Sequence, residues 1–468
     1  MPRENSSASG ADLTVGACGR SASAWHFTTA SPATPACCPR LRHAARDSGM
    51  LPAPRIRGRA ETFARHPKLN PAALGSACYF DAWNPAPERL CLEVIGDALA
   101  TSHGCRALNY RAVEGADDGQ VILRDVTTGS MHSVSPSIVI NATGAWIDRT
   151  NHTLGIHSQF IGGTRGSHLV LDHPALLEQL GGSELFYEND DGRICLLLPW
   201  CDRVLLGTTD IRTDDPDAAV CEADEFDYLR SAARQVFPSI EIRPEQVVAR
   251  FCGVRPLPRS NSGSPGTISR DHACHETPAS AGRPYPVFSL VGGKWTTFRA
   301  FSEQVADRAL AVLGKSRRAS STELPIGGGR DFPPTDDARA RRIDDIASRT
   351  GLPRETCTHL FARYGTTAGR LAAHIAGAGP AAREPVADYL AGELDYLARH
   401  EAVVHLDDLV LRRSHLALFG RLDEASLQKT ASIVAAALGW SEETQEAEVA
   451  RTAALLRERH GIHLRPRN

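Results

Sequence analysis

The residues best suited to chemistry in this 468-residue chain lie in a short segment with two glycines and a lysine. An apolar run ending at Val291 leads into Gly292-Gly293-Lys294 and then into Thr296 and Thr297, where a helical pattern begins. The free N–H groups and the dipole at a helix N-terminus both favour a bound anion. The segment predicts an anion or phosphate site, although a simple strand-to-helix turn with a solvated lysine has the same pattern.

A second junction of the same kind occurs earlier in the chain. A continuous apolar strand ends at Asn141 and runs through Ala142, Thr143 and Gly144 into a helix that begins near Trp146. In nucleotide-binding folds such a turn lets the backbone pass close to a flat cofactor. The local pattern is only moderately specific, because many ordinary strand–turn–helix connections look alike.

The elements between and after these junctions predict three parts. Short strands at 167–171, 194–199, 203–207 and 251–257 favour an antiparallel sheet inserted between two parallel-type segments, with Arg255 and Arg270 at strand ends. A Gly- and Pro-rich linker at 327–334 precedes a run of helical patterns. The last part is therefore predicted to be an all-α domain of about 125 residues, with helices at 339–350, 354–364, 367–376, 385–400, 406–416, 424–438 and 442–460.

Composition excludes some classes of function. A formal net charge of −3 and a pI near 6.7 provide no electrostatic case for nucleic-acid binding. The twelve cysteines have no C-x-x-C pair and no metal-type spacing, which predicts reduced thiols in a cytoplasmic protein without a metal site. No apolar run approaches the roughly 20 residues of a membrane helix. Association with the inner membrane surface and a homodimer both stay open.

Taken in order, seven motifs resemble those of the FAD-dependent glycerol-3-phosphate dehydrogenases. The similarity extends from about residue 67 to residue 460, and seven motifs in order are far more specific than any one of them. The motifs are N-A-T-G-A-W-I-D at 141–148, R-G-S-H-L-V at 165–170, L-P-W at 198–200, G-T-T-D at 207–210, G-V-R-P-L at 253–257, I-S-R-D-H at 268–272 and G-G-K-W-T-T-F-R at 292–299.

This resemblance implies a flavin enzyme that oxidises sn-glycerol 3-phosphate to dihydroxyacetone phosphate and passes electrons to quinone or another acceptor. Arg255 and Arg270 resemble the phosphate and substrate ligands, since guanidinium groups match phosphate oxygens. His168 is the expected general base. Thr209 and Asp210 are expected to order the substrate pocket. The cofactor-binding residues would be Ala142, Thr143, Gly144, Trp146, Gly292, Gly293, Lys294, Thr296 and Thr297. Without the resemblance, a structural histidine, surface ion pairs and a turn aspartate explain these residues as well.

The first 66 residues depart from the family pattern. They show neither strand alternation nor a helical stripe, and they contain no G-x-G-x-x-G motif for the FAD diphosphate. A disordered tail and a segment read in the wrong frame are the two interpretations. Either one predicts weak or absent FAD binding, which a stoichiometric flavin spectrum would contradict.

The predicted fold class is α/β, with an incomplete Rossmann-like FAD-binding domain, an inserted antiparallel β substrate domain and a C-terminal all-α domain. The expected boundaries are a segment at 1–66, a partial FAD-binding domain at 67–157, the substrate domain at 158–285, a return to the FAD-binding domain at 286–325 and the helical domain at 334–468. Two alternative functions stay open, a related flavin oxidase of another small substrate and a non-catalytic remnant that does not bind FAD.

Overall fold

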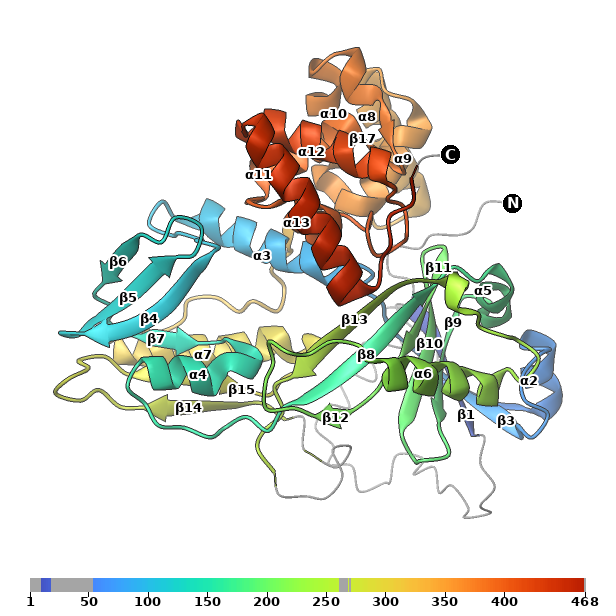
Figure 1. The fold of residues 1–468 in the computed structure, drawn as a ribbon, viewed down its shortest axis with the longest axis horizontal. Coiled ribbons are helices and arrows are strands. Elements are labelled where there is room, and N and C mark those ends of the chain that lie inside the picture. Colours follow the sequence, from blue (N-terminus) through green and yellow to red (C-terminus); the bar gives the residue numbers. More distant parts are fainter. Residues whose placement is uncertain (1–9, 18–53, 261–267, 269–270, 467–468) are drawn as a thin grey trace.

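The computed structural model describes residues 10–17, 54–260, 268 and 271–466. Its largest sheet contains nine strands in the order β12-β8-β11-β10-β9-β1-β3-β2, with β13 also paired to β8 (Figure 1). Most neighbours are antiparallel, but β1 runs parallel to β9. The strands are β1 (Gly10–Ala17), β2 (Arg55–Gly58), β3 (Gly75–Ala82), β8 (Thr164–Leu171), β9 (Ser183–Glu188), β10 (Ile194–Trp200), β11 (Arg203–Gly207), β12 (Ile211–Arg212) and β13 (Val247–Arg255).

Alternating apolar residues let this sheet pack on both faces. Leu169 and Leu171 of β8 belong to a core that includes Leu176 of α5 (Pro174–Leu180) and Leu229 of α6 (Ala223–Val236). Val170, between them, belongs to the core of the C-terminal helices. Successive side chains on a strand point to opposite faces, so β8 joins two layers of the molecule.

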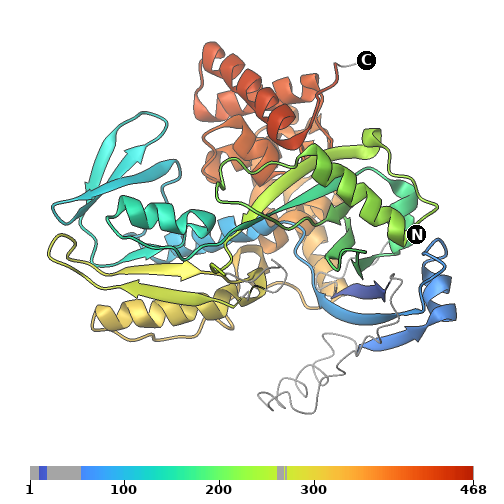
Figure 2. The ribbon, with the colours of Figure 1, turned by 60° about the horizontal axis from the view of Figure 1, so that its bottom comes forward.

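A second sheet holds both glycine junctions. Its order is β14 (Ala273–Thr277), β15 (Val287–Val291) and β7 (Val139–Asn141), and β15 runs parallel to β7 with Phe288 opposite Ile140. Phe301 and Val305 of α7 (Phe298–Val312) are buried against Phe288. Figure 2 shows α7 lying along the β14–β15 pair. In the sequence, β8 to β13 of the large sheet come between β7 and β15, which pair directly with each other.

A smaller unit lies beside the second sheet, away from the nine-stranded sheet (Figure 1). The strands β4 (Arg111–Asp117), β5 (Gln120–Asp125) and β6 (Met131–Val134) form an antiparallel meander, preceded by α3 (Pro87–Thr101). No helix among the described residues is long and apolar enough to cross a membrane.

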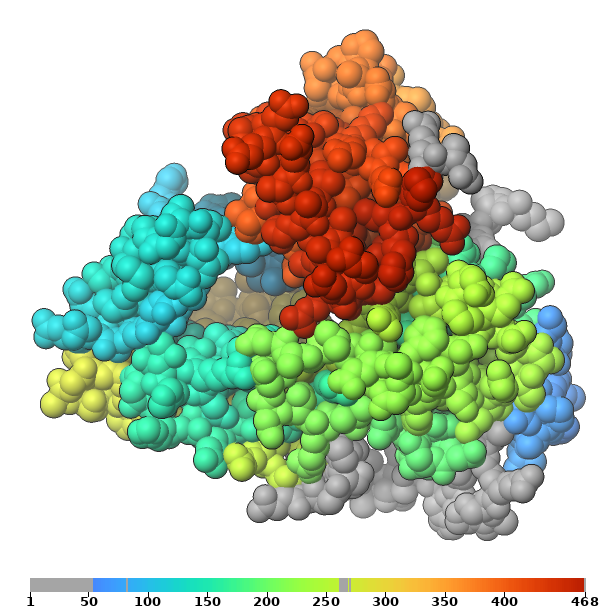
Figure 3. All heavy atoms as spheres, viewed as in Figure 1, coloured from blue at the N-terminus to red at the C-terminus, as the bar shows by residue number. Residues whose placement is uncertain are grey.

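The C-terminal domain is helical and packs on the large sheet. Figure 3 shows this block, orange to red, seated on the green strands. Its core includes Trp200 of β10, which is 7% exposed. The helices are α8 (Asp336–Thr350), α9 (Arg354–Tyr364), α10 (Ala368–Gly377), α11 (Ala391–His400), α12 (Glu424–Leu438) and α13 (Glu442–His460), with a π-helical turn η8 (Asp408–Arg413) before α12.

Three predictions about elements need correction. The helix expected at 385–400 begins only at Ala391, because Pro385–Val386 and Tyr389–Leu390 form a short hairpin, β16 and β17. Residues 1–66 were expected to lack structure, yet β1, β2 and α2 (Arg59–Arg65) lie there. β3 was assigned to the FAD-binding part but pairs within the nine-stranded sheet. Strand pairing is decided by residues far apart in sequence, which a local pattern does not reveal. The domain boundaries stay a prediction.

Candidate active site

The site centres on an open cavity of about 370 Å³ between the two sheets. Three segments far apart in sequence line it: β8 around His168, the end of β13 around Arg255, and the loop after β15 from Gly292 to Lys294. The long pairing of β8 with β13, which places Phe251 opposite His168 and Gly253 opposite Gly166, brings the first two segments together. A backbone hydrogen bond of 3.2 Å from Gly292 N to Pro256 O holds the third segment against the second.

His168 is largely enclosed. Its ring stacks on Phe251 with centroids 5.1 Å apart, and the backbone of Gly207 passes so close that a Cβ there would lie 2.3 Å from the imidazole. The Nδ1 atom is buried without a hydrogen-bond partner. Burial, and then the positive charge of Arg255, lower the pKa of His168 from 6.5 to about 4. The imidazole is therefore neutral near neutral pH and able to accept a proton.

Arg255 lies at the end of β13 with its guanidinium against Gly166. A Cβ at Gly166 would lie 2.3 Å from Nη2, so position 166 of β8 has no room for a side chain. Arg255 Nη2 donates to Thr208 Oγ1 at 2.7 Å, Nη1 donates to Asp210 Oδ1 at 3.2 Å, and both donate to Thr209 O at 3.3 Å. The turn after β11 thus orients a cation that faces the cavity.

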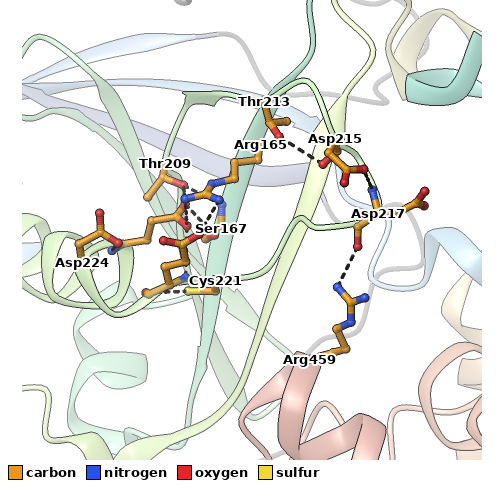
Figure 4. Close-up of polar contacts among 11 residues, drawn as sticks. Arg165, Ser167, Thr209, Thr213, Asp215, Asp217, Cys221, Asp224 and Arg459 are labelled. Atoms are coloured by element: carbon orange, nitrogen blue, oxygen red, sulfur yellow. Dashed lines mark hydrogen bonds and ion pairs between the residues drawn. The ribbon is translucent and has the colours of Figure 1, made fainter. Parts of the chain in front are cut away.

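Thr209 and Asp210 were predicted to order the pocket, and both contact Arg255. Thr209 is 1% exposed, and its hydroxyl donates to Glu225 Oε1 at 2.6 Å while accepting from Ser167 N at 2.9 Å. The hydroxyl therefore points away from the cavity, and only the carbonyl faces Arg255. Figure 4 shows Arg165, Ser167 and Thr209 converging on the start of α6, where Asp224 lies.

The two strand–glycine–helix junctions lie side by side. β7 and β15 are parallel neighbours, so Ala142-Thr143-Gly144 and Gly292-Gly293-Lys294 follow the carboxyl ends of adjacent strands. In open α/β sheets this edge is where ligands bind. A Cβ on Gly144, at φ +63°, would meet nothing within 4 Å, whereas one on Gly292 would lie 2.3 Å from Asp271 O. The glycine at 292 is thus required by the protein's own backbone.

A buried polar network fixes the geometry of this edge. Asn151 of α4 (Ile147–Thr153) is fully buried and accepts from Asn141 Nδ2 at 2.8 Å. Its own Nδ2 donates to Ser289 Oγ of β15 at 3.0 Å and to Ser158 Oγ at 2.9 Å. Asp148 accepts from the same Ser158 hydroxyl and from two backbone N–H groups. One side chain therefore connects both parallel strands and the helix.

The other predicted cofactor residues lie outside the cavity lining. Thr297 caps the short helix η4 (Trp295–Thr297) through a 3.2 Å bond from Lys294 N, and Thr296 is exposed. Trp146 lies in η1 (Gly144–Trp146), is 40% exposed, and donates from Nε1 to Asp217 Oδ1 at 2.9 Å. Asp217 also accepts from Arg459 of α13 through its carbonyl, a contact drawn in Figure 4. Arg270 falls outside the described residues.

Comparison with known proteins identifies the fold family. Residues 20–280 match the family described as FAD dependent oxidoreductase, and residues 319–445 match the C-terminal domain of alpha-glycerophosphate oxidase. The first match covers more than half of the chain. The chain belongs to the FAD-dependent oxidoreductase family.

Relatives of this FAD-dependent oxidoreductase are glycerol-3-phosphate dehydrogenases. The protein from Synechocystis sp. is 31% identical over 74% of this chain and 64% of its own length. The one from Pseudomonas aeruginosa is 29% identical over 62% of this chain and 56% of its own, and the aerobic enzyme of Escherichia coli is 28% identical over 64% and 59%. The chain therefore spans less than two thirds of each of these relatives.

A solved structure has the same fold. The glycerol-3-phosphate dehydrogenase of Bacillus halodurans, determined as a complex with FAD, superposes with a TM-score of 0.72 at 22% identity and covers 86% of this chain and 79% of that one. The predicted fold class, a mixed α/β FAD-binding fold with a C-terminal helical region, is confirmed. At this level of identity the similarity establishes the fold alone.

The residues around the cavity fit the ring end of a flavin. His168 of β8 and Lys294 line the cavity, and the open backbone at Gly144 follows β7, the parallel neighbour of the strand that leads to Lys294. Lys294 is exposed and its positive charge suits an anionic reduced ring or a diphosphate. These residues would hold FAD on one side of the cavity and leave the Arg255 side for a substrate.

Sequence reasoning missed the residues that position the site. Glu225, Asn151 and Ser289 do not line the cavity, and they belong to no motif that indicates a binding role. The only local signal is the capping box at the start of α6, in which Glu225 accepts from Glu222 N at 3.2 Å. Thr208 and Phe251 sit next to predicted motifs, yet their contacts with Arg255 and His168 depend on strand pairing.

Proposed function

We propose that this chain oxidises sn-glycerol 3-phosphate to dihydroxyacetone phosphate in an FAD-dependent reaction, with quinone or another acceptor taking the electrons. The observation that carries the proposal is the shared cavity, which is lined by an oriented arginine on β13 and a neutral, largely enclosed histidine on β8. Such a pair provides a cationic site for a phosphate and a base for a hydroxyl group on one small substrate.

Arg255 would bind the phosphate. A guanidinium already oriented by Asp210 and Thr208 loses little freedom when an anion binds, and its planar geometry matches two phosphate oxygens. Arg270 is proposed as a second ligand from the neighbouring segment. A neutral polyol carries no negative charge for the arginine to bind, so the site would discriminate against glycerol.

His168 would take the proton from the C2 hydroxyl of the substrate. Burial keeps the imidazole neutral, and a phosphate at Arg255 would offset the charge that lowers its pKa, so substrate binding would make the base stronger. FAD, when bound, would accept the hydride from C2, which carries the two electrons of the oxidation. Lys294 would stabilise negative charge on that side of the cavity.

The test is a turnover assay on the full chain with excess FAD, sn-glycerol 3-phosphate and an artificial electron acceptor. Replacement of Arg255 by Lys keeps the charge but removes the planar contact, and we expect kcat/KM to fall by about 10- to 100-fold. Arg212→Lys, an exposed arginine on β12, serves as the control and should retain activity.

Three results would contradict the proposal. Equal turnover of glycerol and glycerol 3-phosphate would exclude a phosphate-specific site. Turnover of a small amine or hydroxy acid in place of both would indicate a related flavin oxidase. Absence of any flavin-dependent turnover or flavin binding would identify the chain as a non-catalytic relative.

A further inference from the structure

The carboxylate of Glu225 is buried on the face of β8 opposite the cavity, and it has no role in the proposed reaction. Glu225 lies in the first turn of α6 and is 1% exposed. Burying a charge is costly unless hydrogen bonds and counter-charges compensate it. Four contacts do so here, and each leads to a residue that shapes the cavity or the helix cap.

The first pair of contacts reaches the cavity walls. Glu225 Oε1 accepts from Ser167 Oγ at 2.9 Å and from Thr209 Oγ1 at 2.6 Å. Ser167 sits on β8 between Gly166, which lies against the Arg255 guanidinium, and His168. Because side chains alternate along a strand, Ser167 points to α6 while the glycine and the histidine face the cavity.

The second pair of contacts provides a positive charge opposite the Glu225 carboxylate and caps the N-terminus of α6. Glu225 Oε2 lies 3.3 Å from Arg165 Nη2 and accepts from Glu222 N at 3.2 Å. Arg165 also pairs with the half-exposed carboxylate of Glu222 at 2.8 Å. Glu222 therefore shares the helix cap and the arginine with Glu225 but forms no hydrogen bond with Thr209 or Ser167.

Two routes from Glu225 converge on the cavity. One passes through Ser167 to the strand that carries His168. The other passes through Thr209, whose carbonyl accepts from both terminal nitrogens of Arg255 at 3.3 Å. Fixing Thr209 by its hydroxyl fixes the carbonyl that orients the guanidinium.

We propose that Glu225 is a positioning residue that sets the orientation of Arg255 and of the strand carrying His168, and thereby the affinity for a phosphorylated substrate. The substrate in this statement rests on the proposed function. The positioning itself rests on the bonds through Ser167 and Thr209.

The test compares Glu225→Gln with Glu222→Gln in the full chain. In Glu225→Gln, an amide NH2 group replaces one of the two oxygens that accept hydrogen bonds. Glu222→Gln removes the half-exposed negative charge that caps the same helix and pairs with the same arginine, Arg165. We expect Glu225→Gln to raise KM for glycerol 3-phosphate and the inhibition constant of inorganic phosphate by about 10- to 100-fold with a much smaller change in kcat. Glu222→Gln should change each by less than about threefold.

A second readout needs no substrate. The NMR titration of the His168 ring, assigned with a His168→Asn variant, reports how close the positive charge of Arg255 lies. We expect its pKa, about 4 in the parent chain, to rise in Glu225→Gln and to stay in place in Glu222→Gln. Thr209→Val should reproduce the shift, and the double variant with Glu225→Gln should add little to either single change.

The outcomes separate the two proposals. If Glu225→Gln lowers only the melting temperature while its His168 titration and phosphate inhibition match those of Glu222→Gln, Glu225 is a structural residue and the inference is wrong. If Thr209→Val leaves the His168 titration unchanged, the route through Thr209 is wrong. If the parent chain does not oxidise glycerol 3-phosphate, the proposed function falls, and the titration still decides the role of Glu225.

Discussion

At the scale of single residues, the environment of His168 decides what this side chain can do. A histidine in water has a pKa near 6.5, so its charge changes just below neutral pH. Here Phe251 covers one face of the ring, Gly207 lets the backbone close over it, and Arg255 disfavours a second positive charge. The enclosed imidazole therefore keeps its lone pair available over a wide pH range.

The pH dependence of turnover tests this role. A pKa lowered to about 4 means that His168 stays neutral as the pH falls from 6.5, so the acid limb of kcat/KM should lie near pH 4 and not near 6.5. His168→Asn should lower kcat by about 10²- to 10⁴-fold and remove that limb. His132→Asn, an exposed histidine on β6, is the control. A limb near 6.5 that persists in His168→Asn would assign the base to another group.

At the scale of elements, one asparagine joins the two strand–glycine–helix junctions. Asn151 lies on α4, yet it hydrogen-bonds to Asn141 at the end of β7 and to Ser289 in β15. The two parallel strands contribute only a few backbone pairs, so the side-chain network fixes their relative position. The edge formed by the carboxyl ends of β7 and β15 therefore depends on Asn151, which does not line the cavity.

Removing this side chain should therefore destabilise the second sheet. Asn151→Ala leaves the buried groups of Asn141 and Ser289 with fewer partners, and we expect a loss of about 2–4 kcal/mol in the free energy of unfolding. Urea unfolding measures it. Asn109→Ala, which removes one exposed bond to Ala402 O, should cost less than about 1 kcal/mol. A similar cost for both variants would contradict a special role for the network.

At the scale of the whole molecule, α3 attaches the C-terminal helical domain to the rest of the chain. Arg89 forms a two-pronged pair with Glu401 in which both side chains are less than 15% exposed, with Nη2 2.7 Å from Oε2. One and two turns further on, Glu93 and Asp97 accept from the backbone N–H groups of Gly328 and Gly327. The polar side of α3 thus holds the linker as well as the domain.

Breaking this pair should loosen the helical domain. Arg89→Ala or Glu401→Ala leaves a partly buried charge without its partner, and we expect a loss of about 2–4 kcal/mol for each. The double variant should lose less than the sum, because the second change removes an already unpaired charge. Limited proteolysis of the segment between α7 and α8, residues 313–335, measured against time, reports the opening. Equal cleavage in the parent and single variants would contradict the prediction.

Much of the local architecture could be predicted from residue patterns. The helices at 354–364, 424–438 and 442–460 match the prediction to the residue, because apolar periodicity and capping residues are local signals. The hairpin at 385–390 was missed because its two short strands, which pair with each other, lie within the segment predicted as one helix. β1 and β2 were missed because their partners β3 and β9 lie elsewhere in the chain. Arg255, His168 and the Gly292–Lys294 segment were named from motifs, and the fold brings them to one cavity.

What the sequence by itself determined is the set of reactive groups and the elements that carry them, since residue type and short-range spacing are written in the chain. Only the tertiary structure decided how these groups behave. Strands that pair across long stretches of sequence produce three features of the site. They bury His168 and keep it neutral, they place the turn that orients Arg255, and they bring the carboxylate of Glu225 behind these two residues. Desolvation and hydrogen bonding depend on what surrounds a side chain, and that environment exists only once the sheets have formed.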